Sequence, residues 1–168
     1  MPERNPRSTA KIAGHPIHPM LVGFPITFFV STLICDVVYL NGGNPAWATG
    51  ALWMVGAGVV TALIAAVFGF TDFVGEERIR HLPDAWRHMI GNLAAVALAA
   101  ISWGLRATQG AEEAVAPWGV TLSAGVALIL LYTGWKGWEL VYRHHVAVQD
   151  KAESPMIERP IARERERT

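Results

Sequence analysis

Four long apolar segments constrain the fold of this 168-residue chain more than any other feature. They cover about residues 20–41, 46–70, 86–108 and 118–141, and the second of them holds no charged residue. A helix of about 20 residues rises about 30 Å, which is the thickness of the hydrocarbon core of a bilayer. We therefore predict an all-α fold, a membrane-spanning up-down four-helix bundle with short loops.

A soluble helical bundle is the alternative fold. Each of its surface helices would need a polar stripe facing water, and the four segments lack one. The rest of the chain predicts a disordered polar tail over residues 1–14, a four-helix transmembrane domain over 15–148, and a charged, disordered tail over 149–168. The single cysteine, Cys35, excludes an intramolecular disulfide.

The basic residues predict the orientation of the bundle. With four spans, the two tails and the loop between the second and third spans lie on one side of the membrane. Of the 14 Lys and Arg residues, 13 fall on that side, and Arg106 is the exception. Because cytoplasmic loops carry the excess of Lys and Arg, we predict that both termini are cytoplasmic.

All the histidines fall at this predicted cytoplasmic end, and histidine commonly ligates haem iron, zinc and copper. They are His15, His18, His81, His88, His144 and His145. His18 precedes Pro19, which suits the first turn of a helix, so its imidazole is expected at the mouth of the bundle. In a polyproline-like run, His15 points the same way but lies about 9 Å from His18. The pattern predicts a cofactor or metal site, and the competing interpretation is that polar interfacial loops simply tolerate histidine.

The third and fourth spans supply the other candidate ligands. His88 and Asn92 are four residues apart and share a helix face, and a buried histidine there needs a hydrogen bond or a metal. His144 and His145 diverge by about 100° on a helix, so only one of them faces the bundle, and we favour His144. We predict that His18 and His88 converge and that His144 joins them, because neighbouring helix axes are about 8 to 10 Å apart.

Two polar side chains complete the candidate site. Asn92 and Asp72 are placed to hydrogen-bond a ligating imidazole or a water, although Asp72 has a second interpretation as a loop cap. The candidate cofactor-binding residues are therefore His18, His88, His144, Asn92 and Asp72. The candidate metal ligands are His15, His18, His88 and His144.

Two charged residues inside the spans predict a buried ion pair. Asp36 lies about one turn from the outer end of the first span, and Arg106 lies near the outer end of the third. Their depths match in a bundle with both termini inside. An unpaired aspartate in hydrocarbon costs a few kcal/mol, so we expect these two side chains to face each other.

Four motifs in this chain resemble those of a known family. They are HPIHPMLVGFPI at 15–26, GFTDF at 69–73, Arg87-His88 with Asn92, and GWELVYRHHVAV at 137–148. Together they resemble the bacterial membrane family called domain of unknown function 2231, over about residues 13–148. The resemblance implies a four-helix protein of the bacterial inner membrane and supplies no reaction.

Three classes of function fit these observations. The first is a haem b-binding redox or electron-transfer module, the second a non-haem metal or proton-handling membrane protein, and the third a structural or partner subunit without a cofactor. The chain lacks CxxCH, P-loop, GxGxxG and HExxH patterns, which disfavours c-type haem, nucleotide and zincin chemistry. We expect the lipid bilayer and a redox partner or membrane complex as partners, no nucleic acid, and no stand-alone enzyme activity, and oligomerisation is left open.

Overall fold

The computed structural model describes residues 5–148, so the predicted tail at 149–168 lies outside the described residues. Four helical segments are long and apolar enough to cross a membrane: Ile17–Gly42, Pro45–Gly75, Pro83–Gln109 and Val115–Tyr142. They pack together in up-down order, which confirms the predicted all-α four-helix bundle. Each segment extends by one to five residues beyond the span predicted at either end.

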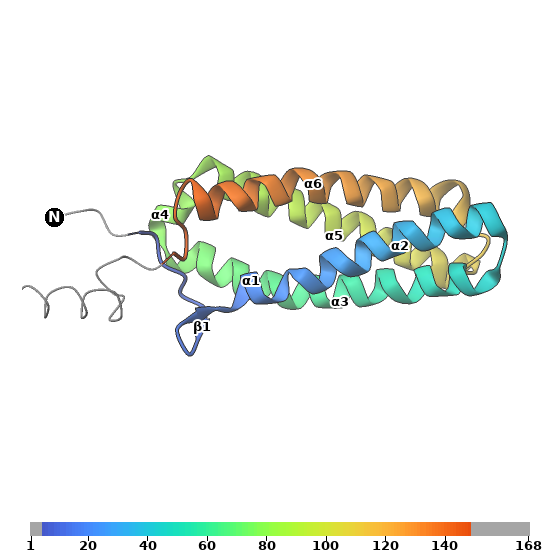
Figure 1. The fold of residues 1–168 in the computed structure, drawn as a ribbon, viewed down its shortest axis with the longest axis horizontal. Helices are drawn as coiled ribbons and strands as arrows, with labels where there is room; N and C mark the ends of the chain where they lie inside the picture. Colours follow the sequence, from blue (N-terminus) through green and yellow to red (C-terminus); the bar gives the residue numbers. More distant parts are fainter. Residues whose placement is uncertain (1–4, 149–168) are drawn as a thin grey trace, which may run out of the picture.

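The elements follow one another along the chain as β1 (Lys11–Ile12), β2 (His15–Pro16), α1 (Ile17–Leu21), α2 (Gly23–Gly42), α3 (Pro45–Gly75), α4 (Glu77–Arg80), α5 (Pro83–Gln109), the π-helical turn η1 (Val115–Gly119) and α6 (Val120–Tyr142). Both ends of the described chain lie at the same end of the bundle (Figure 1), here called the terminal end. The turns that follow α2 and α5 lie at the opposite end, here called the hairpin end.

Local sequence sets the turn between α2 and α3. Gly43 ends α2 in the left-handed conformation with φ of 66°, which glycine adopts without a Cβ penalty. Asn44 then caps α3, because its side chain accepts a hydrogen bond from the backbone N–H of Ala46. Pro45 occupies the first helical position, where a backbone N–H has no partner within the helix, so proline loses no hydrogen bond there.

The first span is divided between α1 and α2 at Val22. Helical hydrogen bonds continue across this division, because Val22 N–H bonds to the His18 carbonyl and Ile26 N–H bonds to the Val22 carbonyl. Pro25 has no N–H to donate to the preceding turn, which accounts for the interruption. Pro19 lies in the first turn of α1, as predicted.

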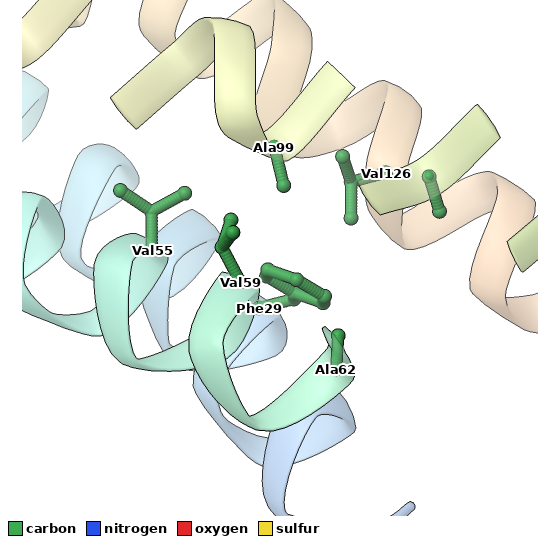
Figure 2. Packing of buried hydrophobic residues seen from close by; sticks show 7 residues of the cluster. Phe29, Val55, Val59, Ala62, Ala99 and Val126 are labelled. Carbon is green, nitrogen blue, oxygen red and sulfur yellow. The ribbon is translucent and has the colours of Figure 1, made fainter. Parts of the chain in front are cut away.

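The centre of the bundle is a layer of buried apolar side chains from both helical hairpins. Phe29 of α2 and Val55, Val59 and Ala62 of α3 face Ala95 and Ala99 of α5 and Val126 of α6. Figure 2 shows Phe29 between the two hairpins. A Cβ on Gly58 would lie 2.5 Å from a ring atom of Phe29, so glycine at this position makes room for the ring.

The outer surface of the bundle is apolar, as expected for helices that face lipid. Large aliphatic side chains in the middle of the spans are mainly exposed, including Val67 at 62% and Leu131 at 73%. A surface this apolar is unfavourable in water and favourable against acyl chains. Apart from the central layer, the helices therefore bury mainly Ala and polar residues, and they present most of their Leu, Ile and Trp side chains outward.

The segment before His15 differs from the predicted disordered tail. From Asn5 onward it packs on the terminal end of the bundle, and Ser8 is buried. Asp72 accounts for this order, since its carboxylate accepts backbone N–H bonds from Thr9 and Ala10, each of 2.7 Å. Asp72 itself lies within α3, which continues to Gly75 instead of ending at residue 70.

Candidate functional site

His18 is held on α3 by a backbone hydrogen bond. Its Nδ1 lies 2.9 Å from the carbonyl oxygen of Ala65, and the ring packs on Gly69, one turn further along α3. A Cβ at Gly69 would lie 2.8 Å from His18 Nδ1, so a larger residue there would displace the ring. Because a carbonyl only accepts, Nδ1 carries the proton and Nε2 carries the lone pair that can ligate a metal.

His88 is held on α6 in the same way. Its Nδ1 lies 2.9 Å from the carbonyl oxygen of Thr133, and a Cβ at Gly137 would lie 3.0 Å from His88 Cε1. The amide nitrogen of Asn92 lies 3.1 Å from His88 Nε2, and the Thr133 hydroxyl donates to the amide oxygen of Asn92 at 2.9 Å. His88, Asn92 and Thr133 thus form a closed set of hydrogen bonds between α5 and α6.

The two imidazoles occupy equivalent places in the two hairpins. Each donates from Nδ1 to a carbonyl of the following span, and each packs on the glycine four residues after that carbonyl. The rings are perpendicular, with centres 6.3 Å apart. His18 and His88 are separated by 70 residues, as are Asp36 and Arg106, which also meet between the hairpins. The same pattern of contacts therefore recurs in the two hairpins, and the histidine pair lies between them.

His144 does not join this pair, contrary to the prediction. Its Nε2 lies 3.2 Å from Asp84 Oδ2, and Asp84 also pairs with Lys136 and Arg87 at 3.1 Å each. The prediction placed His144 on a helix, whereas α6 ends at Tyr142 and His144 lies in the turn that follows. Lys136 lies between Asp84 and Glu139, with its side chain 15% exposed.

Two further candidates also lie away from the pair. His15 is exposed and belongs to β2, where it pairs with Ile12 of β1. Asp72 binds the N-terminal segment through Ser8, Thr9 and Ala10 and contacts no imidazole in any hydrogen bond of the described chain. Within residues 5–148, no group of three or more His, Cys, Asp or Glu side chains is arranged to hold a metal ion. The predicted set of three or four histidine ligands is therefore not formed there.

The ion pair inside the spans is confirmed. Arg106 Nη2 lies 2.7 Å from Asp36 Oδ2, and neither side chain is exposed. Ser123 of α6 donates to the same carboxylate oxygen at 2.8 Å, and Arg106 Nε donates to Ser102 at 3.2 Å. The pair joins α2, α5 and α6 near the hairpin end.

Sequence reasoning missed the groups that hold the imidazoles. These are the backbone carbonyls of Ala65 and Thr133. Every residue carries a backbone carbonyl, so the pattern of side chains in the sequence does not predict which carbonyl binds an imidazole. The signal that was present is the small-xxx-small spacing, Ala65 to Gly69 and Thr133 to Gly137, which lets another helix approach closely.

The four apolar spans and the apolar outer surface define an integral membrane protein of the four-span class. The family described as "Predicted membrane protein (DUF2231)" matches residues 14–150, and the chain belongs to this family. The predicted resemblance is confirmed over nearly the same residues. Neither a curated protein nor a solved structure matches the chain.

Proposed function

We propose that this membrane protein binds one haem b between its two hairpins, with His18 and His88 as the axial ligands. The observation that carries the proposal is the separation of the two rings. A bond from a metal to an imidazole nitrogen is about 2 Å long, and the ring centre lies about 1 Å further away, so ligands on opposite sides of one metal have ring centres about 6 Å apart. The 6.3 Å between the centres of His18 and His88 fits this arrangement.

The number of ligands favours haem over a bare metal ion. A zinc ion in a protein takes three or four protein ligands, whereas a haem iron has four porphyrin nitrogens and needs one or two axial residues. The described chain brings two imidazoles together and no third ligand. A single transition-metal ion is the alternative cofactor, and it would need water or another ligand to complete its coordination.

The surroundings of each ring fit a ligating histidine. The carbonyls of Ala65 and Thr133 fix the Nδ1–H tautomer, which orients the ring and raises the basicity of Nε2. Gly69 and Gly137 leave the space that the rings occupy. The amide nitrogen of Asn92 must move off His88 Nε2 before that nitrogen can ligate a metal. The hydrogen bond from the Thr133 hydroxyl to the amide oxygen would hold the Asn92 side chain beside the site.

A haem in this position would supply reversible one-electron transfer, which makes the chain an electron-transfer module. The residues of the chain hold the cofactor, fix the two imidazoles and surround them with apolar helices. A redox partner or a larger membrane complex would exchange the electrons, and we expect the site to lie on the cytoplasmic side of the bacterial inner membrane. The excess of basic residues at the terminal end supports this orientation.

Reporter fusions test the orientation. A reporter active only outside the cytoplasm, inserted after Gly43 or Gly110, should be active at both turns of the hairpin end. Activity of a cytoplasmic reporter at both turns would reverse the orientation and move the histidine pair to the opposite face.

Cofactor analysis tests the proposed function itself. The detergent-purified protein should contain about one haem b per chain. His18→Ala and His88→Ala should each abolish or strongly reduce the haem content, whereas His81→Ala should leave it unchanged, because His81 is exposed and contacts Glu77. Protein that contains a metal ion but shows no Soret band would overturn the haem assignment in favour of the single-ion alternative. Protein that carries neither, after expression in a haem-producing host, would overturn the proposal.

A further inference from the structure

A small cavity lies inside the bundle between the apolar layer and the Asp36–Arg106 pair. Its volume is about 10 Å³. Its apolar lining comes from the central layer, namely Phe29, Val55, Ala99 and Val126. Three hydroxyl side chains complete the lining: Thr32, Ser102 and Ser123. Each of these is nearly completely buried.

The hydroxyl groups offer both donors and acceptors to the cavity. Ser102 Oγ accepts a bond from Arg106 Nε, which leaves its own O–H free to donate. The single O–H of Ser123 points to Asp36 Oδ2 or is shared with the Gly119 carbonyl, so its oxygen lone pairs remain acceptors. The Thr32 hydroxyl donates to the Phe28 carbonyl and likewise keeps its lone pairs.

The ion pair beside the cavity has two buried atoms without a hydrogen-bond partner in the described chain. They are Asp36 Oδ1 and Arg106 Nη1. Asp36 is 0% exposed and Arg106 is 1% exposed, so bulk water does not reach either side chain. A buried charged atom left without a partner is strongly unfavourable, and proteins usually satisfy such atoms with internal water. An acceptor and a donor without partners therefore belong to the two side chains that Ser123 and Ser102 contact.

We propose that the hairpin half of the bundle contains a water-binding site, in which a water molecule bonds to Thr32, Ser102 and Ser123 beside the Asp36–Arg106 pair. The cavity volume of about 10 Å³ is at the lower end of the roughly 10–15 Å³ that one water needs, and the three hydroxyls supply the two to four polar partners that it requires. The water donates to the oxygens of Thr32 and Ser123 and accepts from Ser102. The water links α2, α5 and α6 through the three hydroxyls, two of which also bond to the Asp36–Arg106 pair, and an apolar ligand would leave these hydroxyls unsatisfied.

The apolar layer separates this water site from the histidine pair. Along the first hairpin, Phe29 comes between His18 and Thr32 on α1 and α2, and Val59 and Ala62 come between Val55 of the cavity and Ala65, the partner of His18, on α3. Along the second hairpin, Ala95 and Ala99 come between His88 and Ser102 on α5. None of these side chains can bond to water. The site is therefore an isolated water position and not one step of a continuous polar path along the bundle.

Water-edited solid-state NMR of the protein in lipid bilayers tests the site. Magnetisation transferred from water protons should reach Ser102 and Ser123 early, while Ala95 in the apolar layer should receive it much later. Because this comparison is made on the wild-type protein, it does not depend on any variant folding correctly. Transfer to Ser102 and Ser123 as late as to Ala95 would show a dry cavity and overturn the proposal.

Thr32→Val combined with Ser102→Ala removes two of the three hydroxyls with little change of shape. The early transfer to Ser123 should be lost in this variant. Thr61→Val is the matched control, because it removes a hydroxyl that bonds within α3 and does not line the cavity. Early transfer to Ser123 that persists in the double variant would overturn the proposed coordination of the water.

Discussion

Removing one member of the Asp36–Arg106 pair should destabilise the bundle strongly. The two side chains are fully buried, and their charged atoms are 2.7 Å apart. Asp36→Ala leaves the guanidinium of Arg106 without its counter-ion and removes one of the two acceptors near the Ser123 hydroxyl. Breaking a buried pair of this kind costs about 3–5 kcal/mol, because an uncompensated charge stays in a medium of low dielectric constant. Arg106→Ala should cost a similar amount for the same reason.

A double-mutant cycle separates the pair from its surroundings. The double variant Asp36→Ala/Arg106→Ala leaves no buried charge, so its free energy of unfolding should lie well above the value expected from adding the two single losses. We expect a coupling of at least about 2 kcal/mol, since residues in one buried network couple by about 0.5–3 kcal/mol. Unfolding by SDS in mixed micelles, monitored by tryptophan fluorescence, measures the loss in free energy of unfolding for each single variant and for the double variant.

Arg143→Ala is the control for this cycle. Arg143 is 69% exposed and lies 3.7 Å from Glu139, so its removal should change the free energy of unfolding little. Single losses that simply add, with a coupling below about 0.5 kcal/mol, would refute the account of the pair as a buried, mutually dependent unit.

Three further predictions concern the terminal end. Gly137→Ala should lower haem content by pushing the imidazole of α5 out of place, whereas Gly134→Ala, which has open space on the same helix, should not. Asp72→Ala should release the N-terminal segment, seen as faster tryptic cleavage before residue 15, and an unchanged cleavage rate would contradict the role assigned to that carboxylate. The hydrogen bond from Arg78 lowers the pKa of Glu76 to about 2 from 4.5, so its stabilising contribution is present above pH 4.5 and is lost as the pH falls toward 2. Melting temperatures at pH 6 and pH 3 should therefore differ more for the wild type than for Glu76→Gln, and equal differences would exclude this contribution.

The architecture of the bundle could be predicted because it depends on local composition. A run of about 20 apolar residues has one stable form in lipid, a helix whose backbone bonds are all internal. The Asp36–Arg106 pair could be predicted for a related reason, since two charges at matching depth have few other partners. Neither prediction required knowledge of how individual side chains are oriented.

The details of the terminal end could not be predicted, because they depend on contacts between distant parts of the chain. The order of residues 5–14 comes from Asp72, a single carboxylate more than 60 residues away, and the segment has no periodicity that reports it. His144 was assigned by a helical angle that does not apply beyond the end of α6. His144 contacts Asp84, which lies 60 residues away in the chain, and this pairing depends on the tertiary fold.

The electron paramagnetic resonance spectrum of the oxidised protein tests the central claim most directly. Two axial imidazoles with perpendicular planes, as in the 90° arrangement of His18 and His88, give ferric haem a highly anisotropic low-spin signal. Nearly parallel imidazoles give a rhombic low-spin signal, and a single axial histidine gives a high-spin one. The account predicts the highly anisotropic signal and its loss in His18→Ala and His88→Ala. A rhombic or high-spin signal in the wild type, or no haem signal at all, would contradict it.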